Sequence, residues 1–214
     1  MLQSLRNLIS LNMDPIERMV RRTPALKSCV ESVRLSYDAL LACFRNGNKL
    51  LLCGNGGSCA DCEHIAGELI KSFYRDRPLD TELAEKLGSE LADNLHGSLP
   101  AIPLASFTTF QTAFANDDNP EYAFAQQVVG LGKSGDMLLA ISTSGNSANI
   151  LHAAKTAHSM GLRVIGLTGE SGGKLAPLCD VAVCAPETDV ARIQELHLPI
   201  YHALCEMIEE AIFG

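Results

Sequence analysis

Five short apolar runs alternate with stretches of helical pattern along this chain of 214 residues. Each run is bounded by Gly, Pro, Asp or Ser, as strands usually are, and the runs lie at residues 49–53, 101–105, 136–141, 163–167 and 181–184. A parallel sheet that is covered by helices on both faces requires such nearly continuous apolar strands. The sequence therefore predicts an α/β fold, a three-layer sandwich in which helices flank a five-stranded parallel sheet.

Long helices are predicted near both ends of the chain. Apolar residues recur at helical spacing over residues 25–44, and Asn46-Gly47-Asn48 ends that pattern, so residues 1–48 form a predicted N-terminal helical segment. Residues 189–212 have the pattern of one long helix. We expect this helix to bend at Pro199, because proline cannot donate a backbone hydrogen bond.

A further helical stretch differs in character. Acidic side chains alternate with leucines that stand four residues apart over residues 79–99. This spacing indicates an amphipathic helix with a narrow apolar stripe. We predict one helix here, inserted between two strands, which packs on its own subunit or on a neighbouring one.

Composition and charge exclude several classes of protein. A hydrophobic content of 47% suffices for one core, and we expect a single domain over residues 1–214. The net charge of −8 argues against nucleic acids and anionic membranes as partners, because clustered Lys and Arg are lacking. The apolar runs are too short to span a membrane. With no secretory segment before the eight cysteines, we expect a cytoplasmic protein with reduced thiols.

The first loop that can bind a ligand joins the first predicted strand to a helix. It runs Cys53-Gly-Asn-Gly-Gly-Ser58. Its glycines permit a tight turn with backbone N–H groups directed into a cleft, where they could hold an anion or sugar hydroxyls. A tight turn without a ligand would need the same glycines. The loop lacks both the Gly-x-Gly-x-x-Gly dinucleotide fingerprint and the Gly-Lys-Ser/Thr ending of a P-loop.

The second loop, Ser142-Thr-Ser-Gly-Asn-Ser147, also follows a strand and begins a helix. Four hydroxyl groups and the free N–H groups of a helix N-terminus favour a phosphate dianion. An ordinary helix cap would need only one hydroxyl. The loop contains no lysine, which suits a sugar monophosphate better than a nucleoside triphosphate with magnesium.

Histidine, glutamate and glutamine side chains form a candidate metal site. His64 and Glu68 stand four residues apart and project from one face of a helix, although such a pair can also form a plain surface hydrogen bond. Gln194 and His202 lie roughly 12 Å apart along the last predicted helix, and His197 is a nearer companion to Gln194. Two histidines, one carboxylate and one amide oxygen would suit zinc or another divalent transition metal.

Two smaller motifs stay open at this stage. Cys59 and Cys62 form a Cys-x-x-Cys at a helix start, where the helix dipole lowers a thiol pKa, but the surrounding pattern is not that of thioredoxin. Asn116-Asp117 follows a short helical stretch and could bring a carboxylate to the cleft. It could equally be a solvated, helix-capping loop.

Taken together, these residues resemble the phosphoheptose isomerases, a branch of the SIS (sugar isomerase) family. The matching motifs occur in the family's order and are Cys53-Gly-Asn-Gly-Gly-Ser-Cys-Ala-Asp-Cys-Glu-His-Ile-Ala-Gly-Glu68, Asn116-Asp117, Ser142-Thr-Ser-Gly-Asn-Ser147, Leu167-Thr-Gly-Glu-Ser-Gly-Gly173 and Arg192-Ile-Gln-Glu-Leu-His197. The resemblance implies a flavodoxin-like SIS fold. It also implies conversion of sedoheptulose 7-phosphate to D-glycero-D-manno-heptose 7-phosphate, for the heptoses of bacterial surface glycans such as lipopolysaccharide.

The resemblance also implies roles for individual residues. One zinc ion per subunit would be held by His64, Glu68, Gln194 and His202. Proton transfer through an enediol would use Glu68 as base and His202 as acid. The family is typically a homotetramer with active sites between subunits. The implied substrate-binding residues are Asn55, Gly56, Gly57, Ser58, Asn116, Asp117, Ser142, Thr143, Ser144, Ser147 and Gln194.

Two departures from the family pattern leave alternatives open. Residues 79–99 are an insertion, and Ala191 stands where family members often carry an acidic residue. One alternative is a non-catalytic, regulatory SIS tetramer that binds another protein, although the retained set of possible metal ligands argues against it. The other is an isomerase of a different sugar phosphate, because the residues alone do not fix the length of the sugar.

Overall fold

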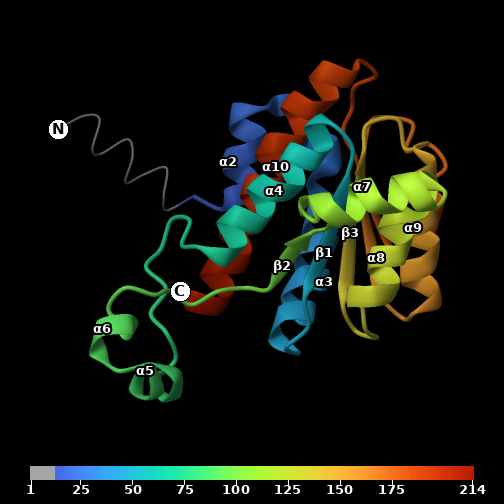
Figure 1. Cartoon of the computed structure of the whole chain (residues 1–214). Helices are drawn as coiled ribbons and strands as arrows, with labels where there is room; N and C mark the ends of the chain where they lie inside the picture. Colours follow the sequence, from blue (N-terminus) through green and yellow to red (C-terminus); the bar gives the residue numbers. More distant parts are fainter. Residues whose placement is uncertain (1–12) are drawn as a thin grey trace.

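The computed structural model describes residues 13–214 and contains one five-stranded sheet, in which all paired strands are parallel (Figure 1). The strand order β2-β1-β3-β4-β5 is that of flavodoxin-like folds. All five strands fall where the sequence predicts them, at Leu50–Gly54 (β1), Ala101–Pro103 (β2), Met137–Ser142 (β3), Arg163–Thr168 (β4) and Val181–Cys184 (β5). The predicted α/β sandwich is confirmed.

Helices and 3-10 turns (η) connect and cover the strands. The α-helices that matter for packing and for the site are α2 (Pro15–Arg22), α3 (Val30–Arg45), α4 (Gly57–Ile70), α7 (Thr108–Asp117), α8 (Ala123–Leu131), α9 (Ala148–Ser159) and α10 (Val190–Phe213). The short turns are η1 (Pro24–Cys29), η2 (Leu104–Ser106), η3 (Pro120–Tyr122) and η4 (Ala176–Leu178).

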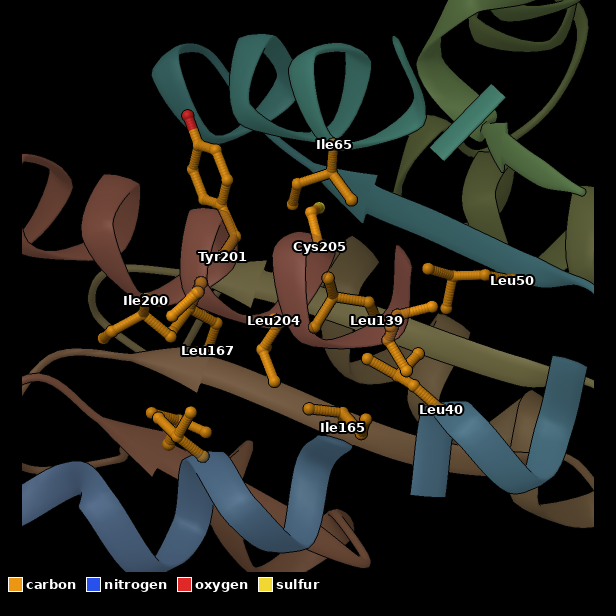
Figure 2. Close-up of a cluster of buried hydrophobic side chains, with 14 of the residues drawn as sticks. Leu40, Leu50, Ile65, Leu139, Ile165, Leu167, Ile200, Tyr201, Leu204 and Cys205 are labelled. Atoms are coloured by element: carbon orange, nitrogen blue, oxygen red, sulfur yellow. The ribbon is translucent and has the colours of Figure 1, made fainter. Parts of the chain in front are cut away.

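The central strands are buried on both faces, which produces two separate apolar cores. Along β1, Leu50 and Leu52 point into one core while Leu51 and Cys53 point into the other, as the two-residue period of a strand requires. Helices α3, α4 and α10 pack in the first core, where Figure 2 shows α10 between α3 and α4. Helices α8 and α9 cover the opposite face. These are the three layers of the sandwich.

The loops that follow β1, β3 and β4 meet at the carboxyl edge of the sheet, because the strands are parallel. The second and third of these loops touch through their backbones: Gly169 N donates to Thr143 O at 2.9 Å, and Leu175 N donates to Gly145 O at 2.9 Å. Gly145 has a φ of +63°, and a Cβ there would overlap the Gly172 carbonyl. Glycine is therefore required at residue 145 for the two loops to close.

The prediction of one helix over residues 79–99 is wrong. The segment contains two short helices, α5 (Thr81–Leu87) and α6 (Ser89–Ala92). Gly88, at a φ of +77°, separates them, because a left-handed residue cannot continue an α-helix. Neither helix has a buried residue, and Leu83, Leu91 and Leu95 are exposed. Figure 1 shows the pair projecting away from the sheet.

The ends of the chain follow the predicted helical pattern where the structure describes them. Residues 1–12 of the predicted N-terminal segment lie outside the described residues, and α2, η1 and α3 form the remainder. Helix α10 runs unbroken through Pro199. No helix within residues 13–214 has the length and apolarity that crossing a membrane requires.

Candidate active site

Helices α4 and α10 lie against each other and bring most of the predicted ligands together (Figure 1). The two helices run side by side in the same direction: Gly57 at the start of α4 faces Gln194, and His64 two turns later faces Tyr201 and His202. The seven-residue step is the same on both helices. Side chains that are 138 residues apart in sequence, His64 and His202, therefore share one site.

Three of the predicted zinc ligands face one another in this site. His64 Nε2 lies 3.2 Å from Glu68 Oε1 and 3.4 Å from His202 Nε2. Atoms that bind one tetrahedral zinc ion at its usual bond lengths lie about 3.3 Å apart, so both separations suit a shared ion. Within residues 13–214, however, no group of three or more His, Cys, Asp and Glu side chains is arranged as a complete metal site. The pairs fit zinc, but a full coordination sphere is not formed.

The partners of His64 determine which of its ring nitrogens can bind a cation. The Tyr201 hydroxyl donates to Asp61 Oδ1 at 3.3 Å and lies 2.9 Å from His64 Nδ1. Because that hydroxyl has one proton, it accepts from a protonated Nδ1, and in a neutral imidazole this arrangement leaves a lone pair on Nε2. This lone pair faces the Glu68 carboxylate, and two acceptors in contact need a cation or a proton between them. The donor chemistry therefore fits a metal ion.

Burial and neighbouring charges shift the pKa of His202, which lies at this contact. Burial lowers the pKa of His202, and the adjacent His64 lowers it further, while Glu68 opposes the shift. The His202 ring is therefore neutral at pH 7, a state in which it can accept a proton on one nitrogen and donate from the other. The second Glu68 oxygen, Oε2, accepts from Lys71 Nζ at 3.0 Å. Oε2 therefore has a hydrogen-bond donor, whereas Oε1 faces the lone pair of His64 Nε2.

Gln194 lies apart from the other three predicted zinc ligands. Its amide group covers Gly57, which is about 10 Å along α4 from His64. This position beside the first loop suits substrate binding and places the amide at the start of α4, away from His64 and Glu68. His197, the alternative ligand, is fully buried and its Nε2 lies 3.1 Å from the Thr168 carbonyl. It therefore points into the core and away from the site.

The first loop is joined to α9 through two side-chain amides. Asn55 Nδ2 donates to Asn149 Oδ1, and Asn149 Nδ2 donates to Asn55 Oδ1, both at 2.9 Å. Gly56, at a φ of +55°, and Gly57 are exposed beside this pair. Ser58 is buried in the first turn of α4. Three of the four predicted residues of this loop are thus open to a ligand.

The second loop borders an open pocket of about 470 Å³ at the carboxyl edge of the sheet. Thr143 and Ser144 line it together with the third loop and the start of α10. Ser142 is buried, and its hydroxyl lies 3.2 Å from that of Ser147. A pocket of this size accommodates a sugar phosphate; the second loop contributes the Thr143 and Ser144 hydroxyls to it, and Glu170 and Glu187 also line it. A separate pocket of about 240 Å³, between α2 and α10, includes His202.

The remaining predicted residues lie outside these contacts. Asn116 and Asp117, at the end of α7, are exposed, and the Asn116 amide donates to Asp117 Oδ1 at 2.8 Å. Cys62 is buried, and burial raises its pKa and that of Cys59. This is the reverse of the shift that a reactive thiol needs. Asp189 caps α10 by accepting from Arg192 N at 3.1 Å.

Comparison with known proteins assigns the chain to a family. A family model for the SIS domain matches residues 16–98 and 97–169. The phosphoheptose isomerase of Aneurinibacillus thermoaerophilus is 44% identical over 170 residues, or 79% of this chain and 76% of that protein. That of Burkholderia pseudomallei (strain K96243) is 39% identical over 198 residues, or 92% of this chain and 91% of that protein. This chain belongs to the phosphoheptose isomerase branch of the SIS domain family. It is therefore an enzyme, a sugar-phosphate isomerase, as the sequence predicts.

Solved structures agree with this assignment. The phosphoheptose isomerase of Neisseria gonorrhoeae matches with a TM-score of 0.73 and 35% identity, covering 96% of this chain and 99% of that one. A phosphoheptose isomerase from Francisella tularensis matches with a TM-score of 0.75 and 32% identity, covering 97% of this chain and 98% of that one. The SIS fold of this isomerase is thereby confirmed over nearly its whole length.

Sequence reasoning missed several residues that support the site. Tyr201 and Asp61 orient His64, Lys71 pairs with Glu68, and Asn149 holds the first loop. Asp61 stands one helical turn before His64, so the helical period could have identified it. Asn149 could not have been identified in this way, because its partner is 94 residues away in sequence.

Proposed function

We propose that this isomerase interconverts sedoheptulose 7-phosphate and D-glycero-D-manno-heptose 7-phosphate, through an enediol, in heptose biosynthesis for bacterial surface glycans. Relatives named phosphoheptose isomerase support the substrate class. The observation that carries the proposal is the contact of His64 with both Glu68 and His202 between α4 and α10. It provides a carboxylate and a neutral imidazole side by side, which are a base and an acid for moving a proton between adjacent carbons.

In this proposal Glu68 removes the proton from the carbon next to the carbonyl and returns it to the neighbouring carbon. Its side chain is 12% exposed, so the carboxylate is only partly solvated, and Lys71 holds its Oε2 oxygen in place. His202 donates a proton to the carbonyl oxygen and accepts one from the adjacent hydroxyl. Its lowered pKa keeps the ring neutral at neutral pH, so both directions of transfer are open.

We also propose that His64, Glu68, Gln194 and His202 hold one Zn²⁺ ion per subunit. The facing acceptor atoms of His64 and Glu68, and the phenol–carboxylate pair behind His64, support this assignment. A bound zinc ion would supply Lewis-acid polarisation of the carbonyl and hydroxyl oxygens. Glu68 could serve as base only while one of its oxygens is free of the metal, which its two oxygens allow.

The two loops at the carboxyl edge of the sheet would bind the rest of the substrate. Ser142, Thr143, Ser144 and Ser147, with the N-terminus of α9, suit the phosphate, because hydroxyl and N–H donors and the helix dipole all favour a dianion. Exposed backbone N–H groups beside Asn55 suit the sugar hydroxyls. Gln194, whose side chain reaches from α10 to the first loop, suits either the sugar or the metal.

We further propose that the enzyme is a homotetramer with active sites between subunits. Helix α7 has no buried residue within the described chain, although it carries Phe110 and Phe114 with ring centroids 5.3 Å apart. Phe107, just before the helix, is 43% exposed. An apolar helix that is uncovered in one chain is expected to meet another chain. Such an arrangement would let Asn116 and Asp117 contribute to a neighbour's site.

The decisive experiment is turnover of sedoheptulose 7-phosphate by the purified protein, with chelator and with zinc added back. We expect the chelator to stop conversion and zinc to restore it. Glu68→Gln should abolish turnover while phosphate-sugar binding stays nearly intact, because it removes the base and not the phosphate loop. Turnover by this variant would overturn the base assignment. Bound zinc and bound sugar phosphate without turnover by the wild type would indicate another sugar or a regulatory role.

A further inference from the structure

A fully buried ion pair lies behind the proposed site and belongs to none of the predicted functional residues. Arg77 and Glu209 are both 0% exposed, and Arg77 Nε donates to Glu209 Oε1 at 2.7 Å. Pairs of this kind contribute little net stability, because desolvation offsets most of their attraction. The role of a pair buried this deeply is therefore better explained by the groups that it holds in place.

Each member of the pair holds a different part of the backbone. Arg77 Nη2 donates to the carbonyl oxygen of Glu68 at 2.8 Å, and Nη1 donates to that of Leu69 at 2.7 Å. These are carbonyls of the last turn of α4, which have no partner within the helix. Arg77 thus fixes the end of α4 at the residue whose carboxylate is the proposed base.

Glu209 holds the loop between α4 and Arg77. Its Oε1 accepts from Phe73 N at 2.7 Å, and its Oε2 accepts from Tyr74 N at 2.7 Å and Arg75 N at 3.1 Å. Burial alone would raise the pKa of Glu209, but the Phe73, Tyr74 and Arg77 donors hold it below its usual range. The carboxylate therefore stays charged, and backbone N–H groups of the loop surround it.

The same loop reaches the proposed acid. The Phe73 ring packs against the His202 ring with centroids 5.5 Å apart, and Tyr74 packs against Phe73 at 4.2 Å. His202 and Glu209 are both on α10, seven residues or two turns apart. The loop that Glu209 holds therefore also contacts the His202 imidazole, two turns earlier on the same helix.

We propose that Arg77 and Glu209 act as positioning residues for catalysis: they fix the last turn of α4, which carries Glu68, and the Phe73 ring, which confines His202. This inference rests on the proposed roles of Glu68 and His202. It concerns their alignment and assigns no contact with the substrate to either member of the pair.

Glu209→Gln and Arg77→Lys are the test variants. Glu209→Gln keeps the size of the side chain but replaces one acceptor oxygen by a donor. Arg77→Lys keeps the charge but cannot bond both carbonyls in the planar geometry of a guanidinium. We expect kcat to fall by about 10²-fold in Glu209→Gln while KM changes by less than about threefold, because misalignment acts on the chemical step. Arg77→Lys should retain more kcat than Arg77→Met, since it keeps part of the contact.

Asp136→Asn is the matched control. Asp136 is also fully buried, forms an ion pair with Lys49, and accepts from Lys133 N at 2.9 Å, but it lies at the amino edge of the sheet, just before β3. The Asp136→Asn substitution should lower the melting temperature and leave kcat unchanged. The assays are run well below every melting temperature. If Glu209→Gln does not fold, Arg77→Lys carries the same comparison.

A second readout does not depend on turnover. The imidazole NMR resonances of His64 and His202 in metal-free protein should move in Glu209→Gln and stay in place in Asp136→Asn. Unchanged kcat together with unchanged resonances, despite a lowered melting temperature, would overturn the positioning role. Absence of turnover in the wild type would instead overturn the proposed function, and the resonances would then decide the positioning role alone.

Discussion

Replacing Gly57 with alanine should lower the activity of the enzyme and leave its stability nearly unchanged. Gly57 is the first residue of α4, and a Cβ there would overlap the Gln194 amide, whose Oε1 would lie at 3.1 Å and whose nitrogen would lie closer. Gln194 is a flexible side chain, so it can rotate away while the backbone stays in place. The substitution therefore displaces one proposed ligand and leaves the rest of the fold untouched.

The expected magnitudes follow from these contacts. Alanine is preferred over glycine in a helix by about 0.5–1 kcal/mol, which offsets the small cost of moving Gln194. We expect the free energy of unfolding to change by less than about 1 kcal/mol, and the melting temperature by no more than about 4 °C for a chain of this length. We expect kcat/KM to fall by about 10²-fold, because a displaced ligand misplaces the substrate or the metal.

Gly67→Ala provides the control for this experiment. Gly67 lies on the same helix, and an added Cβ would have nothing within 4 Å, so this variant should gain helix stability and keep its activity. Both variants are assayed for turnover of sedoheptulose 7-phosphate and for urea-induced unfolding. Equal kcat/KM values for the two variants would refute a role for Gln194 at the site.

Two further predictions concern a buried histidine and the pair of asparagines. Burial lowers the pKa of His197 to about 4, although the hydrogen bond that its ring donates to the Thr168 carbonyl opposes the shift. The unfolded state therefore binds a proton first as pH falls, and the free energy of unfolding of the wild type should drop by up to about 3 kcal/mol between pH 6.5 and 4. Urea unfolding across this range should show a shallower drop for His197→Leu, and parallel curves would contradict the assignment. Asn149→Ala removes two hydrogen bonds to Asn55, each worth about 1 kcal/mol, and should raise KM several-fold with kcat retained. An unchanged KM would exclude a role for Asn149 in holding the first loop.

The sequence determines the fold because its signals are local. Each strand appears as an apolar run between turn residues, and the parallel arrangement follows from the helices between the runs. The loops 53–58 and 142–147 could be assigned to the carboxyl edge for the same reason. Local patterns were insufficient in the insertion, where Gly88 takes a left-handed conformation and divides the predicted helix.

The site was predicted as a set of residues but not as an arrangement. Helical periodicity puts His64 and Glu68 on one face. It does not show that His202 meets His64, that Gln194 lies over Gly57, or that His197 points into the core. Those relations depend on how α10 packs beside α4.

The buried pair behind the proposed site could be found only from the tertiary structure. Arg77 and Glu209 are 132 residues apart in sequence, and as isolated letters they are indistinguishable from solvated surface charges. Packing removes both from water, and a buried charge must then find partners among whatever groups the fold places nearby. The sequence alone thus determined the order of the elements and the chemistry available to them. The tertiary structure decided which of those groups meet, because contacts between distant segments depend on the packing of whole helices.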